Sequence, residues 1–107
     1  KNEIFGPVAN ILRARDESEA IRIANETPYG LCGAVHTRDI NRGIRVAKFL
    51  QTGMVHVNDQ PVNDEPHVAF GGEKDSGIGR FGGEWILEAF TTHQWISVQE
   101  KKRDYPF

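Results

Sequence analysis

Two helical segments, each preceded by an aspartate, constrain the fold of this sequence most strongly. Asp16 precedes the first segment and Asp39 the second, and an aspartate in that place accepts hydrogen bonds from the free N–H groups of a first helical turn. Glu19 follows Asp16 at the spacing of a capping box. Pro28 and Gly30 prevent the first helix from continuing into the next segment.

Four short apolar segments flank these helices and predict strands, because they are too short for helices and bounded by turn-forming residues. They are residues 8–14, 31–37, 54–58 and 94–100. Strands that alternate with helices form right-handed βαβ units. The predicted fold class is therefore α/β, with alternating strands and helices on a mostly parallel sheet.

The second half of the chain is less regular. Gly53 stands where the second helix is expected to end. A polar loop with two prolines and six glycines covers residues 59–83, and residues 84–90 predict a short helix. Loops that follow parallel strands commonly hold the binding groups of α/β proteins. Residues 59–70 of this loop are therefore the expected source of substrate contacts.

Composition and charge exclude several function classes. A formal net charge of -2 gives no general attraction to nucleic acid or to an anionic membrane surface. No apolar run approaches the roughly 18 residues of a membrane-spanning helix. The single cysteine cannot form an internal disulfide, which predicts a cytoplasmic protein. The four histidines lack metal-ligand spacing, so no metal site is expected.

The first candidate site is the motif Glu3-Ile4-Phe5-Gly6-Pro7 at the start of the chain. The two oxygens of a carboxylate can accept hydrogen bonds from both hydroxyls of a ribose. A phenyl ring two residues later can pack against a flat ring of a ligand. The residues alone leave an alternative open, in which Glu3 is a solvated turn residue and Phe5 anchors a core.

A second motif, Phe70-Gly71-Gly72-Glu73-Lys74-Asp75-Ser76-Gly77-Ile78-Gly79-Arg80, follows in the loop. In this order the two motifs resemble the C-terminal part of an aldehyde dehydrogenase, from Glu3 to about Gln99. The stretch from His56 to Gly82 is similar to bacterial benzaldehyde, vanillin and salicylaldehyde dehydrogenases. His56 and Ala69 depart from the Trp and Pro that are common in the wider family.

The resemblance implies that residues 1–92 are a C-terminal portion of the catalytic domain and that residues 93–107 are an oligomerisation strand and tail. It implies a homo-oligomer, with a dimer as the expected state, and a nicotinamide cofactor, NAD or NADP. Glu3 and Phe5 would contact the nicotinamide ribose, and Phe70 would line the aldehyde tunnel. The aldehyde would be oxidised to a carboxylic acid, and an aromatic aldehyde is expected.

The resemblance also implies that no catalytic residue lies in this chain. In the family, the nucleophilic Cys and the Glu that activates water precede the Glu-x-Phe-Gly-Pro motif. Cys32 is expected to be a small apolar residue of a strand. Because Lys1 lies within a motif and no Met precedes it, the chain is interpreted as an enzyme fragment that is inactive alone.

Two alternatives remain open. One is a self-association module that uses the last strand. The other is a stand-alone dinucleotide-binding unit that uses the G-x-G-x-x-G pattern from Gly77 to Gly82. That pattern requires a strand immediately before it, whereas residues 72–76 are polar and turn-forming. In the family this stretch is a structural turn, and Lys74 and Gly77 frame a monovalent cation in some relatives; no cation site is predicted here.

Overall fold

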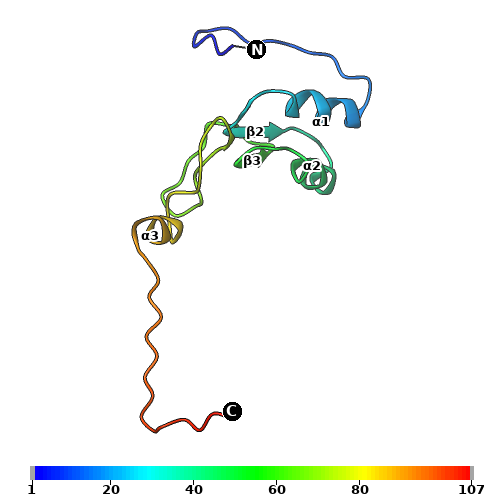
Figure 1. Ribbon diagram of the computed structural model, residues 1–107. Coiled ribbons are helices and arrows are strands. Elements are labelled where there is room, and N and C mark those ends of the chain that lie inside the picture. The colour runs from blue at the N-terminus through cyan, green and yellow to red at the C-terminus, as the bar shows by residue number, and fades with distance from the viewer. Residues whose placement is uncertain (1, 107) are drawn as a thin grey trace.

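A computed structural model describes residues 2–106 of the chain. Within that range it contains three helices and four short strands. They are α1 (Glu17–Asn25), β1 (Tyr29–Gly30), β2 (Cys32–Val35), α2 (Ile40–Ala47), β3 (Met54–Val57), β4 (Glu73–Lys74) and α3 (Trp85–Phe90). Helices α1 and α2 lie beside β2 and β3, and α3 lies further along the molecule (Figure 1). An N-terminal arm, residues 2–15, and a C-terminal arm, residues 91–106, extend from this body.

The parallel strand pair predicted from the alternation is present. Strands β2 and β3 pair in parallel, from Cys32 opposite Met54 to Val35 opposite Val57. Helix α2 connects them, and its buried residue Gly43 leaves room for the sheet, because a Cβ there would lie 2.7 Å from Val57 Cγ1. Segments 31–37 and 54–58 therefore form the two strands of a βαβ unit.

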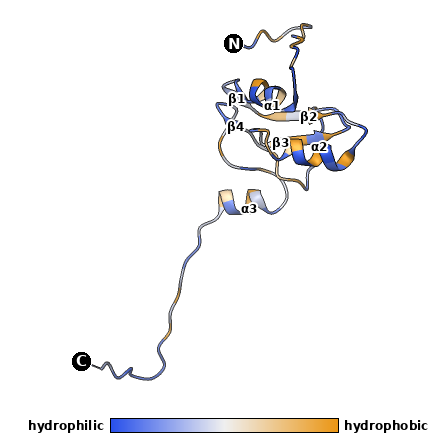
Figure 2. Cartoon of the chain, turned by 90° about the vertical axis from the view of Figure 1, so that its right-hand side faces the viewer, coloured by the Kyte–Doolittle hydropathy of each residue, from blue (hydrophilic) through white to orange (hydrophobic). Residues whose placement is uncertain are grey.

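In place of one mostly parallel sheet, the described residues form two separate strand pairs, of which β2–β3 is parallel. Strands β1 and β4 form a separate antiparallel pair, with Tyr29 opposite Lys74 and Gly30 opposite Glu73 (Figure 2). Each pair contains two strands only. The polar residues of β4 gave no periodic signal, because a strand of two residues is too short to show alternation.

Both aspartate caps are confirmed. Asp16 Oδ1 accepts a hydrogen bond from the N–H of Glu19 at 2.8 Å, and Asp39 Oδ1 accepts one from Arg42 at 3.0 Å. The reciprocal half of the capping box is wrong. The carboxylate of Glu19 instead accepts the backbone N–H of Arg15 at 2.7 Å and its guanidinium Nε–H at 2.9 Å. These bonds with Arg15 lower the pKa of Glu19 below its usual value.

Gly53 does not end the second helix. Helix α2 ends at Ala47, and the N–H of Lys48 bonds back to the carbonyl of Ile44. Gly53 immediately precedes β3, where a Cβ would lie 1.8 Å from the carbonyl oxygen of Gly71. Position 53 thus requires glycine because two backbone segments approach closely there, and not because a helix ends there.

The strands predicted over residues 8–14 and 94–100 are not formed in the structure. Both segments belong to the arms, and their side chains are solvent-exposed, as Ile11 at 93% and Trp95 at 91% illustrate. A strand needs a neighbour to complete its backbone hydrogen bonds, and no described residue pairs with either segment in a strand. The sequence pattern in these two segments predicts an extended backbone, but it does not show whether a pairing strand is present.

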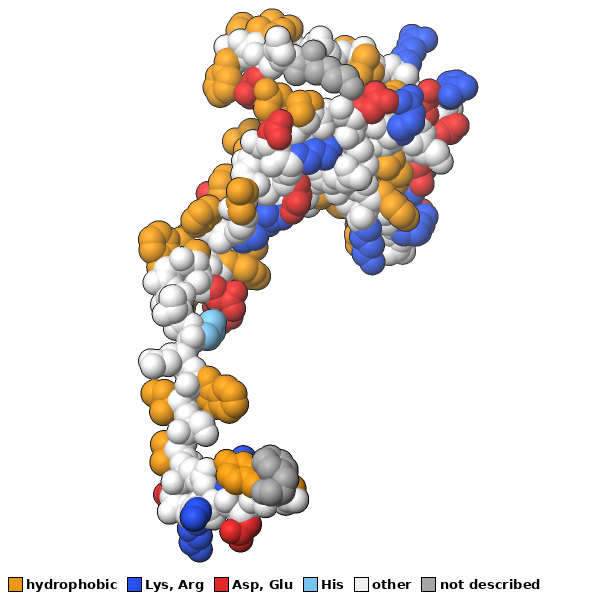
Figure 3. All heavy atoms as spheres, in the orientation of Figure 1, with side chains coloured by type: hydrophobic (Ala, Val, Ile, Leu, Met, Phe, Trp, Pro, Cys, Tyr) orange, Lys and Arg blue, Asp and Glu red, His pale blue; other side chains and the backbone are white. Residues whose placement is uncertain are grey.

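The described residues bury no large apolar side chain completely. The accessible surface of 9633 Å² is roughly 1.6 times that of a compact monomer of this mass. The radius of gyration, 21.3 Å, likewise exceeds the roughly 13 Å expected of a compact domain of this length. Figure 3 shows hydrophobic side chains along the outside of the body and of the C-terminal arm. Extensive apolar surface is therefore available for other protein segments to cover. None of the helices within residues 2–106 is long and apolar enough to cross a membrane.

Candidate functional site

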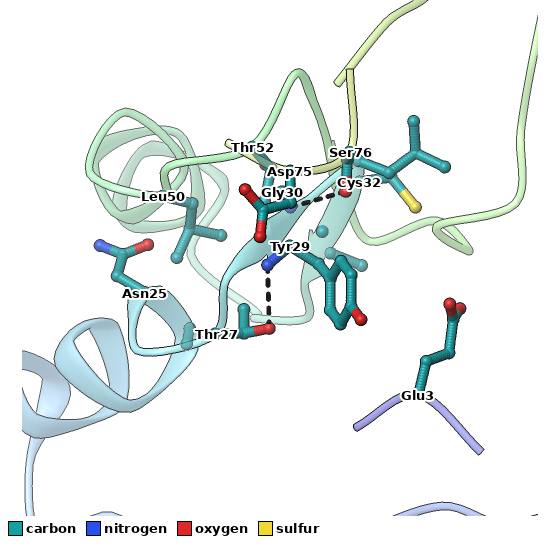
Figure 4. A pocket seen from close by; sticks show the side chains of 14 residues that line it. Glu3, Asn25, Thr27, Tyr29, Gly30, Cys32, Leu50, Thr52, Asp75 and Ser76 are labelled. Atoms are coloured by element: carbon teal, nitrogen blue, oxygen red, sulfur yellow. Dashed lines mark hydrogen bonds between the residues drawn. The ribbon is translucent and has the colours of Figure 1, made fainter. Parts of the chain in front are cut away.

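An open cavity of about 700 Å³ lies between the N-terminal arm and the body of the molecule. Its lining includes Glu3, Tyr29, Cys32, Asp75 and Ser76. Glu3 stands alone on the arm, whereas the other labelled side chains come from the end of α1, from β1 and β2, and from the loops beside them (Figure 4). The cavity thus joins the first motif to the turn within the second.

The wall of this cavity is held together by polar contacts of the second motif. The N–H of Gly30 donates to Ser76 Oγ at 2.9 Å. Lys74 Nζ donates to the carbonyl oxygens of Asn25 at 2.8 Å and Thr27 at 3.0 Å, at the C-terminal end of α1. These carbonyls would otherwise lack a partner at the helix end, so Lys74 stabilises the junction between α1 and β4.

Of the two residues predicted to contact the cofactor, one lines the cavity and the other does not. Glu3 lines the cavity, and among residues 2–106 its carboxylate makes no hydrogen bond or ion pair. The Phe5 side chain is 92% exposed and does not line the cavity, and the backbone at Phe5 has a positive φ of 53°. Phe5 therefore anchors no core within the described chain. Both side chains are free to meet a ligand or another protein segment.

Phe70, the predicted substrate-pocket residue, lies outside the cavity that contains Glu3. It is half-buried, and its backbone pairs with Phe81 through two hydrogen bonds. The N–H of Phe70 donates to the Phe81 carbonyl at 2.8 Å, and the N–H of Phe81 donates in return at 2.7 Å. The described residues thus bring Phe70 to Phe81, and Phe70 does not share the cavity that Glu3 lines.

The glycines of the G-x-G-x-x-G pattern have structural explanations. Gly77, Gly79 and Gly82 have φ values of 151°, 76° and 83°, which side-chain-bearing residues rarely adopt. A Cβ at Gly82 would also lie 2.4 Å from the carbonyl oxygen of Val68. The strand before the pattern, β4, is antiparallel to its neighbour and ends at Lys74. This geometry favours the turn interpretation over a dinucleotide fingerprint.

Sequence reasoning missed the role of Asn58. Its N–H donates to the Val35 carbonyl at 2.8 Å, and its Oδ1 accepts the N–H of Thr37 at 2.8 Å. These bonds fasten the carboxyl ends of β2 and β3 together. The φ of Asn58 is 61°, and asparagine tolerates this left-handed conformation better than most residues, so an Asn as the last residue of a predicted strand was an available signal.

Cys32 is half-buried on β2 opposite Met54, as expected for a small apolar strand residue. Within residues 2–106, no three His, Cys, Asp or Glu side chains gather in a way that could hold a metal ion.

Comparison with known proteins identifies the larger protein class. The profile of the Aldehyde dehydrogenase family matches residues 1–96. A benzaldehyde dehydrogenase of Bacillus subtilis is 60% identical over 107 residues, which are 100% of this chain and 22% of that protein. A vanillin dehydrogenase of Corynebacterium glutamicum is 50% identical over 99 residues, which are 92% of this chain and 20% of that protein. The chain spans about a fifth of the length of these curated relatives.

Solved structures of aldehyde dehydrogenases also match this chain. A crystal structure of a salicylaldehyde dehydrogenase from Pseudomonas putida G7, complexed with salicylaldehyde, matches 99% of this chain and 22% of its own, with a TM-score of 0.93 and 42% identity. A Mycobacterium tuberculosis aldehyde dehydrogenase complexed with NAD+ matches 86% of this chain and 19% of its own, with a TM-score of 0.81 and 42% identity. The open shape of the present chain is therefore shared with a segment of a larger enzyme. This chain belongs to the aldehyde dehydrogenase family.

Proposed function

We propose that this chain is the C-terminal portion of an NAD- or NADP-dependent aldehyde dehydrogenase that oxidises an aromatic aldehyde to the carboxylic acid. The observation that carries the proposal is the 60% identity, over the whole chain, with a protein named benzaldehyde dehydrogenase. Relatives named vanillin and salicylaldehyde dehydrogenase add support, because these names also denote aldehydes on a benzene ring.

Within such an enzyme, Glu3 would hold the ribose of the cofactor. Both of its carboxylate oxygens are uncommitted among residues 2–106, so they can accept the two ribose hydroxyls. The cavity of about 700 Å³ lies within the size range of small-molecule sites. The exposed ring of Phe5 offers a flat apolar face for the nicotinamide. A bound nicotinamide would accept the hydride from the aldehyde carbon.

The catalytic nucleophile and base would be supplied by a part of the enzyme that this chain does not span. Cys32 is half-buried in β2 opposite Met54, as a small apolar strand residue would be, which supports this division of roles. The chain would position the cofactor and shape the aldehyde site, and it would be inactive alone. Positioning of this kind can supply several kcal/mol of barrier reduction.

The C-terminal arm would pair with a second subunit. Trp95, Ile96 and Val98 expose their side chains, and the backbone of residues 94–99 has no strand partner within residues 2–106. An unpaired extended segment with apolar side chains is suited to complete the sheet of another chain. Symmetric pairing would give a dimer, the commonest closed arrangement.

The proposal can be tested in a hybrid enzyme, in which this chain replaces the matching segment of the Bacillus subtilis benzaldehyde dehydrogenase. Replacement is straightforward because the match covers 100% of the chain. The inserted chain supplies Glu3, Phe5, Phe70 and the C-terminal arm together. Substitutions in the hybrid then report on the chain within a complete active site.

In the hybrid, Phe70→Ala should lower kcat/KM for benzaldehyde more than for a short aliphatic aldehyde. An aromatic pair is worth about 0.5–1.5 kcal/mol beyond area burial, so the ratio of the two efficiencies should fall about twofold to tenfold. Steady-state kinetics with both aldehydes measure it. Phe49→Ala removes an exposed ring near the end of α2 and serves as the control. Equal losses for the two aldehydes would remove Phe70 from the aldehyde site.

A further inference from the structure

One side chain, Arg80, connects the two segments that pair at Phe70 and Phe81. Its Nη1 donates to the carbonyl oxygens of Gly72 at 3.0 Å and Gly79 at 2.9 Å. Its Nη2 pairs with the carboxylate of Glu73. The side chain of Arg80 is only 25% exposed, so these contacts are partly shielded from water. A single planar guanidinium thus binds acceptors both before and after the turn.

The aliphatic part of Arg80 also fixes the backbone next to Phe70. A Cβ on Gly71 would lie 3.0 Å from Arg80 Cδ and 2.4 Å from the carbonyl oxygen of Gly79. The carbonyl of Gly71 also occupies the space that a Cβ on Gly53 would need. Gly71 is buried between these groups. The backbone next to Phe70 is therefore enclosed by Gly53, just before β3, and by Arg80.

From these contacts we infer that Arg80 is a positioning residue for Phe70 and that it sets the preference of the enzyme for aromatic aldehydes. The inference rests on the proposed role of Phe70 in the aldehyde site. A ring contributes to selectivity only if its edge and face stay in one orientation relative to the substrate. The two segments are joined by the two backbone hydrogen bonds between Phe70 and Phe81 and by one from the Gly83 N–H to the Pro66 carbonyl. The Arg80 contacts add a side-chain link on the other side of Phe70.

Arginine suits this role because its donors lie in one rigid plane. The guanidinium satisfies two carbonyls and one carboxylate at once, whereas a lysine ammonium is a flexible point charge. Arg80→Met keeps much of the aliphatic stem over Gly71 and removes all the donors. Arg80→Lys keeps the charge and part of the donor capacity. The two variants separate packing from hydrogen bonding.

The first measurement is hydrogen exchange of the Phe70 and Phe81 amides in the hybrid enzyme, which requires no turnover. Arg80→Met should accelerate their exchange roughly tenfold, because the paired backbone opens more easily once the charged donors are lost. The Val57 amide in β3 should not change. Arg22→Met is the matched control, since Arg22 is exposed on α1 and, among residues 2–106, its ion pairs are with Glu19 of that helix and Glu26 at its cap.

The second measurement is the ratio of kcat/KM for benzaldehyde to that for a short aliphatic aldehyde. Arg80→Met should lower this ratio about twofold to tenfold, Arg80→Lys should restore part of it, and Arg22→Met should leave it unchanged. Unchanged exchange at Phe70 and Phe81, or equal losses for both aldehydes, would overturn the inference. Whether the unsubstituted hybrid oxidises benzaldehyde decides the proposed function separately.

Discussion

Gly53→Ala is expected to destabilise the β2–β3 unit more than any other single methyl addition discussed for this chain. The added Cβ would lie 1.8 Å from the carbonyl oxygen of Gly71, and a backbone group cannot rotate away as a side chain can. Either β3 or the segment that carries Phe70 must move. Overpacking of this kind costs about 1–3 kcal/mol or more, and here the upper end is expected because both partners are backbone.

Gly33→Ala is the matched control, because Gly33 lies in β2 of the same sheet. A Cβ at Gly33 would lie 3.5 Å from Leu50 Cδ1 and 3.6 Å from Thr52 Oγ1, which is ordinary contact. The thermal unfolding midpoint of the hybrid should therefore fall with Gly53→Ala and change little with Gly33→Ala. Equal midpoints for the two variants would show that the Gly53–Gly71 approach is not required.

The largest expected effect on catalysis is that of Glu3→Gln. The amide keeps the shape of the side chain, but it loses the charge and has one acceptor oxygen in place of two. A hydrogen bond to a charged group contributes about 1.5–3 kcal/mol, so hydride transfer should slow by about tenfold to hundredfold. Binding of the aldehyde should change less, because Glu3 is proposed to contact the cofactor alone.

Single-turnover kinetics of the hybrid with deuterated and ordinary benzaldehyde isolate the hydride step. Glu84→Gln serves as the control, because Glu84 precedes α3 and makes no capping hydrogen bond through its side chain. A hydride step as fast in Glu3→Gln as in Glu84→Gln would make Glu3 a solvated turn residue. The proposed cofactor contact would then be withdrawn.

The parts of the fold that were predictable from the sequence are those that local chemistry determines. Asp16 and Asp39 cap the helices as expected, because the cap depends on one side chain and the N–H groups that follow it. The strands around Val35 and Val57 were recognisable as compact apolar segments. In these places a few consecutive residues contain the whole signal.

The parts that could not be predicted depend on residues far apart in the sequence. The pairing of Tyr29 with Lys74 joins two strands of two residues, and the reason for Gly53 is the carbonyl of Gly71. Neither approach leaves a periodic pattern. The predictions for the two arms went wrong for the opposite reason. Segments such as residues 94–100 have the sequence pattern of a strand, but they lack a neighbouring strand within the described chain.

The candidate site likewise contains one residue that local sequence predicted and one that it did not. Glu3 was predicted from a short motif, and the structure places it on the wall of the cavity. Its contact with the cofactor stays a prediction. Arg80 was passed over as part of a glycine-rich pattern, because its acceptors, the carbonyls of Gly72 and Gly79, are backbone groups that no residue type reveals. Side-chain chemistry can be read from a sequence, whereas backbone acceptors require the fold.

The central claim is that this chain completes the active site of an aldehyde dehydrogenase. Aldehyde-dependent NADH production, measured for the hybrid, for this chain alone and for the Bacillus subtilis enzyme without the matching segment, tests it most directly. The hybrid should oxidise benzaldehyde, and neither part alone should do so, because the cofactor contacts and the nucleophile lie in different parts. A folded hybrid without activity would contradict the claim, as would NADH production by this chain alone that Cys32→Ala abolishes.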